Sequence, residues 1–215
     1  MRFPRLNAIV DADIAARHDW RPVDLACAYW DGGARFLQIR AKQASSRDFL
    51  VLVEGVIEEL TARGAGSDTI VIVNDRADVA RLAGAAGVHV GQEDLAPADV
   101  RSVIGGAVIV GLSTHTPEQI AASAGEPVDY IAIGPVFGTA TKDTGYAAVG
   151  LERVQLAARG PHPVVAIGGI TLEQAPSVIQ AGAAAVAVIG DLLRTGDPVG
   201  RVHAYVRALD AMTVE

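Results

Sequence analysis

The chain has 215 residues, of which 50% are hydrophobic, 20% charged and 5% aromatic. Its formal net charge of −7 argues against a general nucleic-acid surface or a surface for anionic membranes. No apolar run approaches the roughly 18 residues that a membrane span requires. The first apolar run is too short for a signal peptide, and the single cysteine, Cys27, suits a reducing compartment. We therefore expect a cytoplasmic protein with neither nucleic-acid nor membrane partners.

Short apolar segments recur along the whole chain and alternate with alanine-rich segments. They are often β-branched and show little polar alternation, which is typical of strands buried on both faces. The expected strands are residues 6–10, 36–39, 70–73, 88–90, 108–110, 130–133, 164–167 and 185–189.

The segments between these strands carry helix signals. Residues 22–30 open with a proline in the first turn, and residues 46–63 carry apolar side chains at helical spacing. Further helix starts are predicted at Pro97, at Pro117 with Thr116 as its cap, and at the capping-box pair Thr171 and Gln174.

Eight strand–helix units, with no linker or low-complexity segment between them, predict an α/β fold. The arrangement that such a repeat favours is a single-domain (β/α)8 TIM barrel over residues 1–215. An open, doubly wound sheet is the alternative, because periodicity alone does not distinguish the two.

Polar residues gather where the second strand ends. Gln38, Arg40 and Lys42 alternate with apolar residues, so in an extended segment their side chains project from one face. An amide beside two cations suits a polar heterocycle flanked by phosphates. A frayed strand end with solvated charges is the alternative.

Two carboxylates follow the third and fourth strands, Asp75 and Asp94. The carboxyl ends of barrel strands share one rim, and Mg²⁺ favours one or two carboxylates together with water and phosphate oxygens. The pair therefore predicts a magnesium–diphosphate site. Capping of the helices that follow explains the two positions equally well.

Glycine-rich exits follow the seventh and eighth strands, at residues 168–169 and 189–190. Backbone N–H groups at such exits commonly hold a phosphomonoester. The exit of the sixth strand, residues 134–144, combines glycines, threonines and Lys142 and is either a second anion-binding loop or an ordinary surface turn. Ser113 adds a hydroxyl after the fifth strand.

Six motifs, in order along most of the chain, resemble those of the thiamine-phosphate synthase family. They are QIRAK at 38–42, NDRAD at 74–78, GVHVGQED at 87–94, GLSTHT at 111–116, GPVF at 134–137 with TATK at 139–142, and IGGI at 167–170. The resemblance implies a TIM-barrel transferase that joins a hydroxymethylpyrimidine diphosphate to a thiazole phosphate and releases diphosphate. Small molecules are then the partners, and a homo-oligomer is left open.

The resemblance also implies a role for each matched residue. The pyrimidine diphosphate would be held by Gln38, Arg40, Lys42, Asn74, Ser113 and Lys142, of which Arg40, Lys42, Lys142 and Ser113 would be catalytic. Asp75 and Asp94 would bind Mg²⁺. The thiazole phosphate would be held by Thr139, Thr141, Gly169, Ile189 and Gly190. Gly190 departs from the serine that is frequent in the family, so one side-chain donor to that phosphate is missing.

Two alternatives to a synthase remain. A thiazole tautomerase of the same superfamily would carry a histidine in the loop after the sixth strand, where this chain has Pro135. A non-catalytic regulatory barrel that binds phosphate ligands would be expected to lose Lys142 or a metal carboxylate, and neither is lost. His89 lies within a strand segment and is expected to be a packed, hydrogen-bonded residue.

Overall fold

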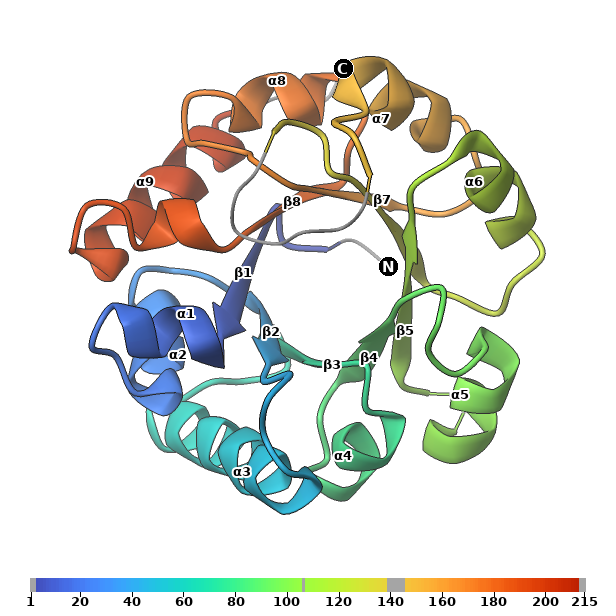
Figure 1. The fold of residues 1–215 in the computed structure, drawn as a ribbon. Helices are drawn as coiled ribbons and strands as arrows, with labels where there is room; N and C mark the ends of the chain where they lie inside the picture. The colour runs from blue at the N-terminus through green and yellow to red at the C-terminus, as the bar shows by residue number, and fades with distance from the viewer. Residues whose placement is uncertain (1–2, 106, 139–145, 213–215) are drawn as a thin grey trace.

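A computed structural model describes residues 3–105, 107–138 and 146–212. Within these residues, eight parallel strands pair in chain order, and β8 pairs with β1 to close a barrel. Figure 1 looks along the barrel and shows the helices as an outer ring around the strands. The expected TIM barrel is confirmed, and the open doubly wound sheet is excluded because its edge strands would remain unpaired.

The strands agree with the expected segments to within a few residues at each end. They are β1 (Leu6–Asp11), β2 (Phe36–Arg40), β3 (Ile70–Asn74), β4 (Gly87–Val90), β5 (Ile109–Thr114), β6 (Tyr130–Ile133), β7 (Val164–Ile167) and β8 (Ala185–Val188). Nearly every residue in them is buried, because one face packs on the helices and the other fills the barrel interior.

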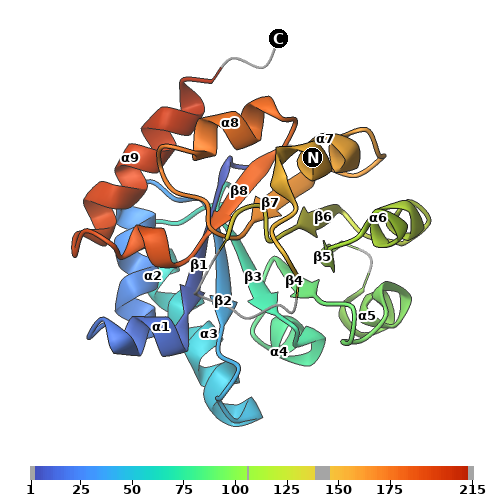
Figure 2. The same ribbon diagram turned by 45° about the horizontal axis from the view of Figure 1, so that its top comes forward.

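The helices lie between and after the strands. They are α1 (Ala12–Arg17), α2 (Pro22–Asp31), α3 (Ser46–Ala62), α4 (Ala77–Leu82), α5 (Pro97–Ile104), α6 (Pro117–Ser123), α7 (Gly150–Ala158), α8 (Ala175–Gln180) and α9 (Pro198–Asp210), with a 3₁₀ turn, η1 (Gly190–Leu192), after β8. Figure 2, tilted from that view, shows α2 and α9 side by side along β1. Cys27 is buried in α2.

Most, though not all, of the helix starts expected from local signals are present in the structure. Thr116 forms the expected capping box with Gln119 at the start of α6. The capping-box prediction at Thr171 was wrong, because α8 begins at Ala175 with Gln174 as its N-cap residue and no side-chain cap. Only half of the box forms, with the Gln174 side chain accepting from the backbone N–H of Thr171 at 3.1 Å.

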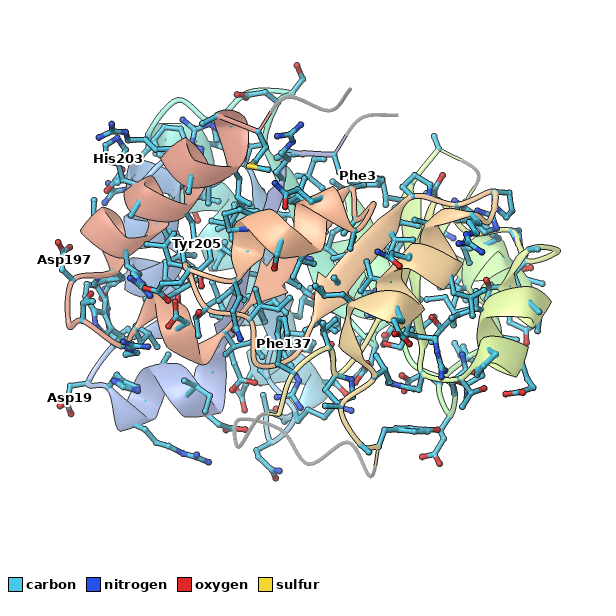
Figure 3. The ribbon with its side chains drawn as sticks, turned by 90° about the horizontal axis from the view of Figure 1, so that it is seen from above. Phe3, Asp19, Phe137, Asp197, His203 and Tyr205 are labelled. Carbon is cyan, nitrogen blue, oxygen red and sulfur yellow. The ribbon has the colours of Figure 1, made fainter. Side chains whose placement is uncertain are left out.

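Two apolar layers stabilise the barrel. The larger lies between strands and helices, and a smaller cluster fills the interior of the barrel. The end of the interior at which the strands begin is closed by Phe3, Phe36 and Tyr130, whose ring centroids lie 5.3 to 5.9 Å apart. Figure 3 shows Phe3 and Phe137 near opposite ends of the barrel. These three aromatic rings therefore leave the barrel open at its other end, where the strands finish.

Candidate active site at the carboxyl ends of the strands

A cavity of about 600 Å³ opens at the carboxyl ends of the strands. Seven of the residues expected from the sequence line it: Gln38, Arg40, Asn74, Ser113, Gly169, Ile189 and Gly190. Lys42, Asp75 and Asp94 are not among its lining residues and stand on the neighbouring rim, after β2, β3 and β4. Thr139, Thr141 and Lys142 lie outside the described residues.

The wall formed by β2 and β3 carries the amide and guanidinium groups. Gln38 is 4% exposed, and its Nε2 donates to Oδ1 of Asn74 at 3.2 Å. Arg40 is paired with the buried carboxylate of Asp11 on β1. Asp11 also caps α1 by accepting from two backbone N–H groups. The guanidinium of Arg40 is therefore held by a carboxylate that is itself oriented by a helix N-terminus.

Lys42 and Asp75 form an ion pair on the rim, with the ammonium nitrogen 2.9 Å from Oδ2. The backbone of Asp75 has a positive φ of 65°, a conformation that aspartate and asparagine tolerate better than most residues. Its N–H donates to the carbonyl of His89 at 2.7 Å, which ties the exit of β3 to β4 and orients the carboxylate.

Asp94 stands close to this pair. Its Oδ2 accepts from the backbone N–H of Gly91 at 2.7 Å. Partial desolvation at the rim and the neighbouring carboxylate of Asp75 raise the pKa of Asp94. Mutual repulsion of two carboxylates is relieved by a bound cation, so the donor set of Asp75 and Asp94 fits Mg²⁺.

Neither carboxylate caps a helix, the alternative that the sequence leaves open. The N-cap residue of α4 is Arg76, without a side-chain cap, and that of α5 is Ala96, also without one. The carboxylate of Asp94 instead accepts a hydrogen bond from the backbone N–H of Gly91 within its own loop. Helix capping therefore does not account for these two positions.

A buried chain of side chains stands behind Ser113. The hydroxyl of Tyr130 lies 3.0 Å from Nδ1 of His89, and Nε2 of His89 lies 2.9 Å from Oγ of Ser113. Burial raises the pKa of Tyr130, so its hydroxyl stays protonated and can donate. His89 is 8% exposed, which confirms the expected packed histidine, yet it also lines the cavity.

One residue of the sequence, Gly111, gives a local reason why these three side chains can meet. A Cβ on Gly111 would lie 2.1 Å from Cζ of Tyr130 and 2.5 Å from Nδ1 of His89. The glycine thus leaves the space in which the phenol and imidazole meet. Nothing local in the sequence signals that Tyr130, on the next strand, is the partner.

The exits of β6 and β7 are joined by backbone hydrogen bonds. Val136 donates to the carbonyl of Ile167 at 2.8 Å, and Phe137 donates to that of Gly168 at 2.9 Å. Gly169 has a φ of 65°, and a Cβ there would lie 2.4 Å from the carbonyl oxygen of Gly138. The second glycine therefore allows the two exits to approach each other closely.

His115 and Tyr146 stack beside the β6 exit, with ring centroids 4.1 Å apart and ring planes 11° apart. Nδ1 of His115 lies 2.6 Å from the carbonyl oxygen of Gly134. Gly134 and Tyr146 are thus both in contact with His115 at the exit of β5.

The exit of β8 brings in two residues that lie outside the sequence motifs, Asp191 and Arg194, both of which line the cavity. The side chain of Asp191 is 8% exposed and pairs with Arg201 of α9 at 2.6 Å. The glycine-rich exit thus continues directly into a charged segment. The only sequence signal for this charged segment was the presence of Asp191 and Arg194 themselves, whose spacing matches no motif.

The fold and this cavity place the protein among the (β/α)8 barrels that carry a pocket with polar side chains at the carboxyl ends of the strands. A family model described as "Thiamine monophosphate synthase" matches residues 6–192. The chain therefore belongs to the thiamine monophosphate synthase family.

Individual relatives agree with the family. The thiamine-phosphate synthase of Koribacter versatilis is 43% identical over 212 residues and covers 97% of each chain. That of Anaeromyxobacter dehalogenans is 40% identical over 191 residues, covering 88% of this chain and 84% of the relative. The solved thiamine phosphate pyrophosphorylase of Pyrococcus furiosus superposes with a TM-score of 0.85 at 26% identity and covers 96% of each chain.

No helix in the described part of the chain is both long and apolar enough to cross a bilayer.

Proposed function

We propose that this protein is a thiamine-phosphate synthase that joins a hydroxymethylpyrimidine diphosphate to a thiazole phosphate within this one catalytic barrel. The observation that carries the proposal is the grouping of Gln38, Asn74 and Arg40 in the cavity beside the rim cluster of Lys42, Asp75 and Asp94. Amides suit the ring of a pyrimidine, and the rim cluster suits its diphosphate.

The proposed reaction breaks one bond and forms another. The bond between the pyrimidine methylene carbon and the diphosphate oxygen breaks, and its electron pair leaves with diphosphate. The thiazole nitrogen then donates its lone pair to the methylene carbon, which gives thiamine phosphate. The chain supplies position and charge, because the reaction needs neither a protein nucleophile nor a protein base.

The cationic side chains have defined roles in this proposal. Arg40, oriented by Asp11, and Lys42, held on Asp75, face the negative charge that develops on the departing diphosphate. Lys142 is assigned the same role from its motif alone. Asp75 and Asp94 would hold Mg²⁺, which would supply further positive charge to the leaving group.

Ser113 orients the substrate in this proposal and does not attack it. With the Tyr130 hydroxyl donating to Nδ1 of His89, Nε2–H donates to Ser113. The hydroxyl proton of Ser113 is then directed toward a ligand oxygen or ring nitrogen. Thr139, Thr141, Gly169, Ile189 and Gly190 are proposed to hold the thiazole phosphate.

The test is direct. The purified protein is mixed with both substrates and Mg²⁺, and thiamine phosphate and diphosphate are quantified, with a chelator-treated sample as control. Equal amounts of the two products, lost on chelation, would support the proposal. Isomerised thiazole phosphate without thiamine phosphate would contradict it and favour the tautomerase, for which His115 is the histidine near the β6 loop.

A further inference from the structure

Arg194 stands on the cavity wall at the exit of β8, and none of the motifs includes it. It follows η1, and its backbone N–H donates to the carbonyl of Asp191 at 3.4 Å. Its side chain is 65% exposed, and the residue lines the same cavity as Gly169 and Gly190. Among the described residues that the β7 and β8 exits contribute to the cavity, Arg194 alone carries a cationic side chain.

One carboxylate oxygen of Asp191, the acidic neighbour of Arg194, already accepts hydrogen bonds from other groups. Oδ2 of Asp191 accepts from Arg201 and from the Tyr205 hydroxyl, each at 2.6 Å, and from the backbone of Leu172 at 3.2 Å. Figure 3 shows Tyr205 on α9, where the side chain is fully buried. Asp191 and Arg201 therefore form a close, largely buried pair through Oδ2, and only Oδ1 of Asp191 approaches Arg194.

The contact between Arg194 and Asp191 is correspondingly loose. Nη1 of Arg194 lies 3.6 Å from Oδ1 of Asp191, against 2.6 Å for Arg201. The other nearby acid, Glu173, approaches Arg201 at 3.8 Å and is 67% exposed, so solvent screens its charge. The positive charge of Arg194 thus remains available to an anion in the cavity.

The backbone beside Arg194 offers donors but no charge. None of the hydrogen bonds found between described residues uses the N–H of Gly169, Ile170 or Gly190. Gly190 has no side chain to donate from. A phosphate monoester carries close to two negative charges at neutral pH, so a site made of amides alone lacks the counter-charge that a guanidinium provides.

We propose that Arg194 binds the phosphate of the thiazole phosphate substrate, completing a site whose other donors are the backbone N–H groups of Gly169 and Gly190. The identity of this ligand rests on the proposed function. The planar guanidinium can donate two parallel hydrogen bonds to phosphate oxygens. Arg194 thereby selects the phosphorylated acceptor over its alcohol.

The test compares Arg194→Gln and Arg194→Lys with Arg47→Gln. Arg47 lies in the first turn of α3, is exposed and does not line the cavity, so it controls for the loss of one rim charge. For Arg194→Gln, we expect KM for thiazole phosphate to rise roughly ten- to hundredfold, with kcat and KM for the pyrimidine diphosphate nearly unchanged. Arg194→Lys should be intermediate, and Arg47→Gln should match the unmodified protein.

The dephosphorylated thiazole alcohol separates phosphate binding from a structural role. Arg194→Gln should use it as well as the unmodified protein does. An unchanged KM for thiazole phosphate would overturn the proposal, and so would equal losses for the phosphate and the alcohol. Calorimetric titration with thiazole phosphate tests Arg194 even if no thiamine phosphate is made. Weaker binding by Arg194→Gln then supports its role, and equal binding overturns it.

Discussion

The ammonium of Lys42 lies 2.9 Å from a carboxylate oxygen of Asp75. The proposed diphosphate site and the proposed metal site therefore share an ion pair. A metal-bound diphosphate offers both partners new contacts, with the carboxylate turning to the metal and the ammonium to phosphate oxygens. Lys42 thus holds the Asp75 carboxylate in place until substrate arrives.

Asp75→Asn should reduce turnover about a hundredfold or more, because it removes a metal carboxylate and the partner of Lys42. The fold should survive, since asparagine tolerates the positive φ of 65° at this position. Steady-state kinetics across a range of Mg²⁺ concentrations measures the effect. Asp78→Asn is the matched control, because Asp78 lies on the nearby α4 and its carboxylate pairs with Arg76. Full activity of Asp75→Asn without Mg²⁺ would refute the metal assignment.

The affinity for Mg²⁺ should rise with pH above 3.8, the ordinary pKa of Asp94, because the pKa of this carboxyl is raised and the metal binds only its ionised form. In the metal-free protein the sign is opposite. The folded chain holds the proton of Asp94 to higher pH than the unfolded chain, so this group's contribution to stability falls as pH rises through the same window.

Thermal unfolding with and without Mg²⁺ over a pH series measures both effects. Asp94→Asn isolates them, since the difference between this variant and the unmodified protein removes the contribution of all other titrating groups. A difference that does not vary with pH would show that Asp94 titrates normally and has no part in metal binding.

Tyr130→Phe should lower kcat about tenfold with a stability cost of roughly 1 kcal/mol, the usual contribution of one hydrogen bond. The ring would keep its packing against Phe3 and Phe36. If Tyr130 acts through His89 on Ser113, the double variant with Ser113→Ala should be no slower than Ser113→Ala alone. Additive losses in this double-mutant cycle would mean that Tyr130 acts independently of Ser113.

Gly169→Ala should raise KM for thiazole phosphate and lower the melting temperature. The added Cβ would lie 2.4 Å from the carbonyl oxygen of Gly138, so the exits of β6 and β7 would have to move apart. Gly64→Ala is the control, since Gly64 also has a positive φ, of 94°, with no atom within 4 Å of a Cβ. Equal effects of the two substitutions on KM would show that backbone strain, and not the approach of the two exits, causes the loss.

Local signals in the sequence predicted the strands and several of the helix starts. Burial on both faces requires continuous apolar residues, so each strand is visible without knowledge of its neighbours. The Thr116 cap is local in the same way, since its partner Gln119 lies three residues away. The expected start at Thr171 failed because Pro176, which has no N–H, cannot donate to the carbonyl of Leu172 and continue the helix from that point.

The sequence by itself determined which residues reach the rim, because strand ends and alternation follow from local composition. Only the tertiary structure decided how they pair. Arg40 with Asp11, His89 with Tyr130, and Lys42 with Asp75 each join different strands or strand exits. Such contacts depend on strand adjacency and register, which arise when the barrel closes and leave no spacing in the sequence. The same closure places Arg194 beside the glycine-rich exits of β7 and β8, where its positive charge is only loosely paired.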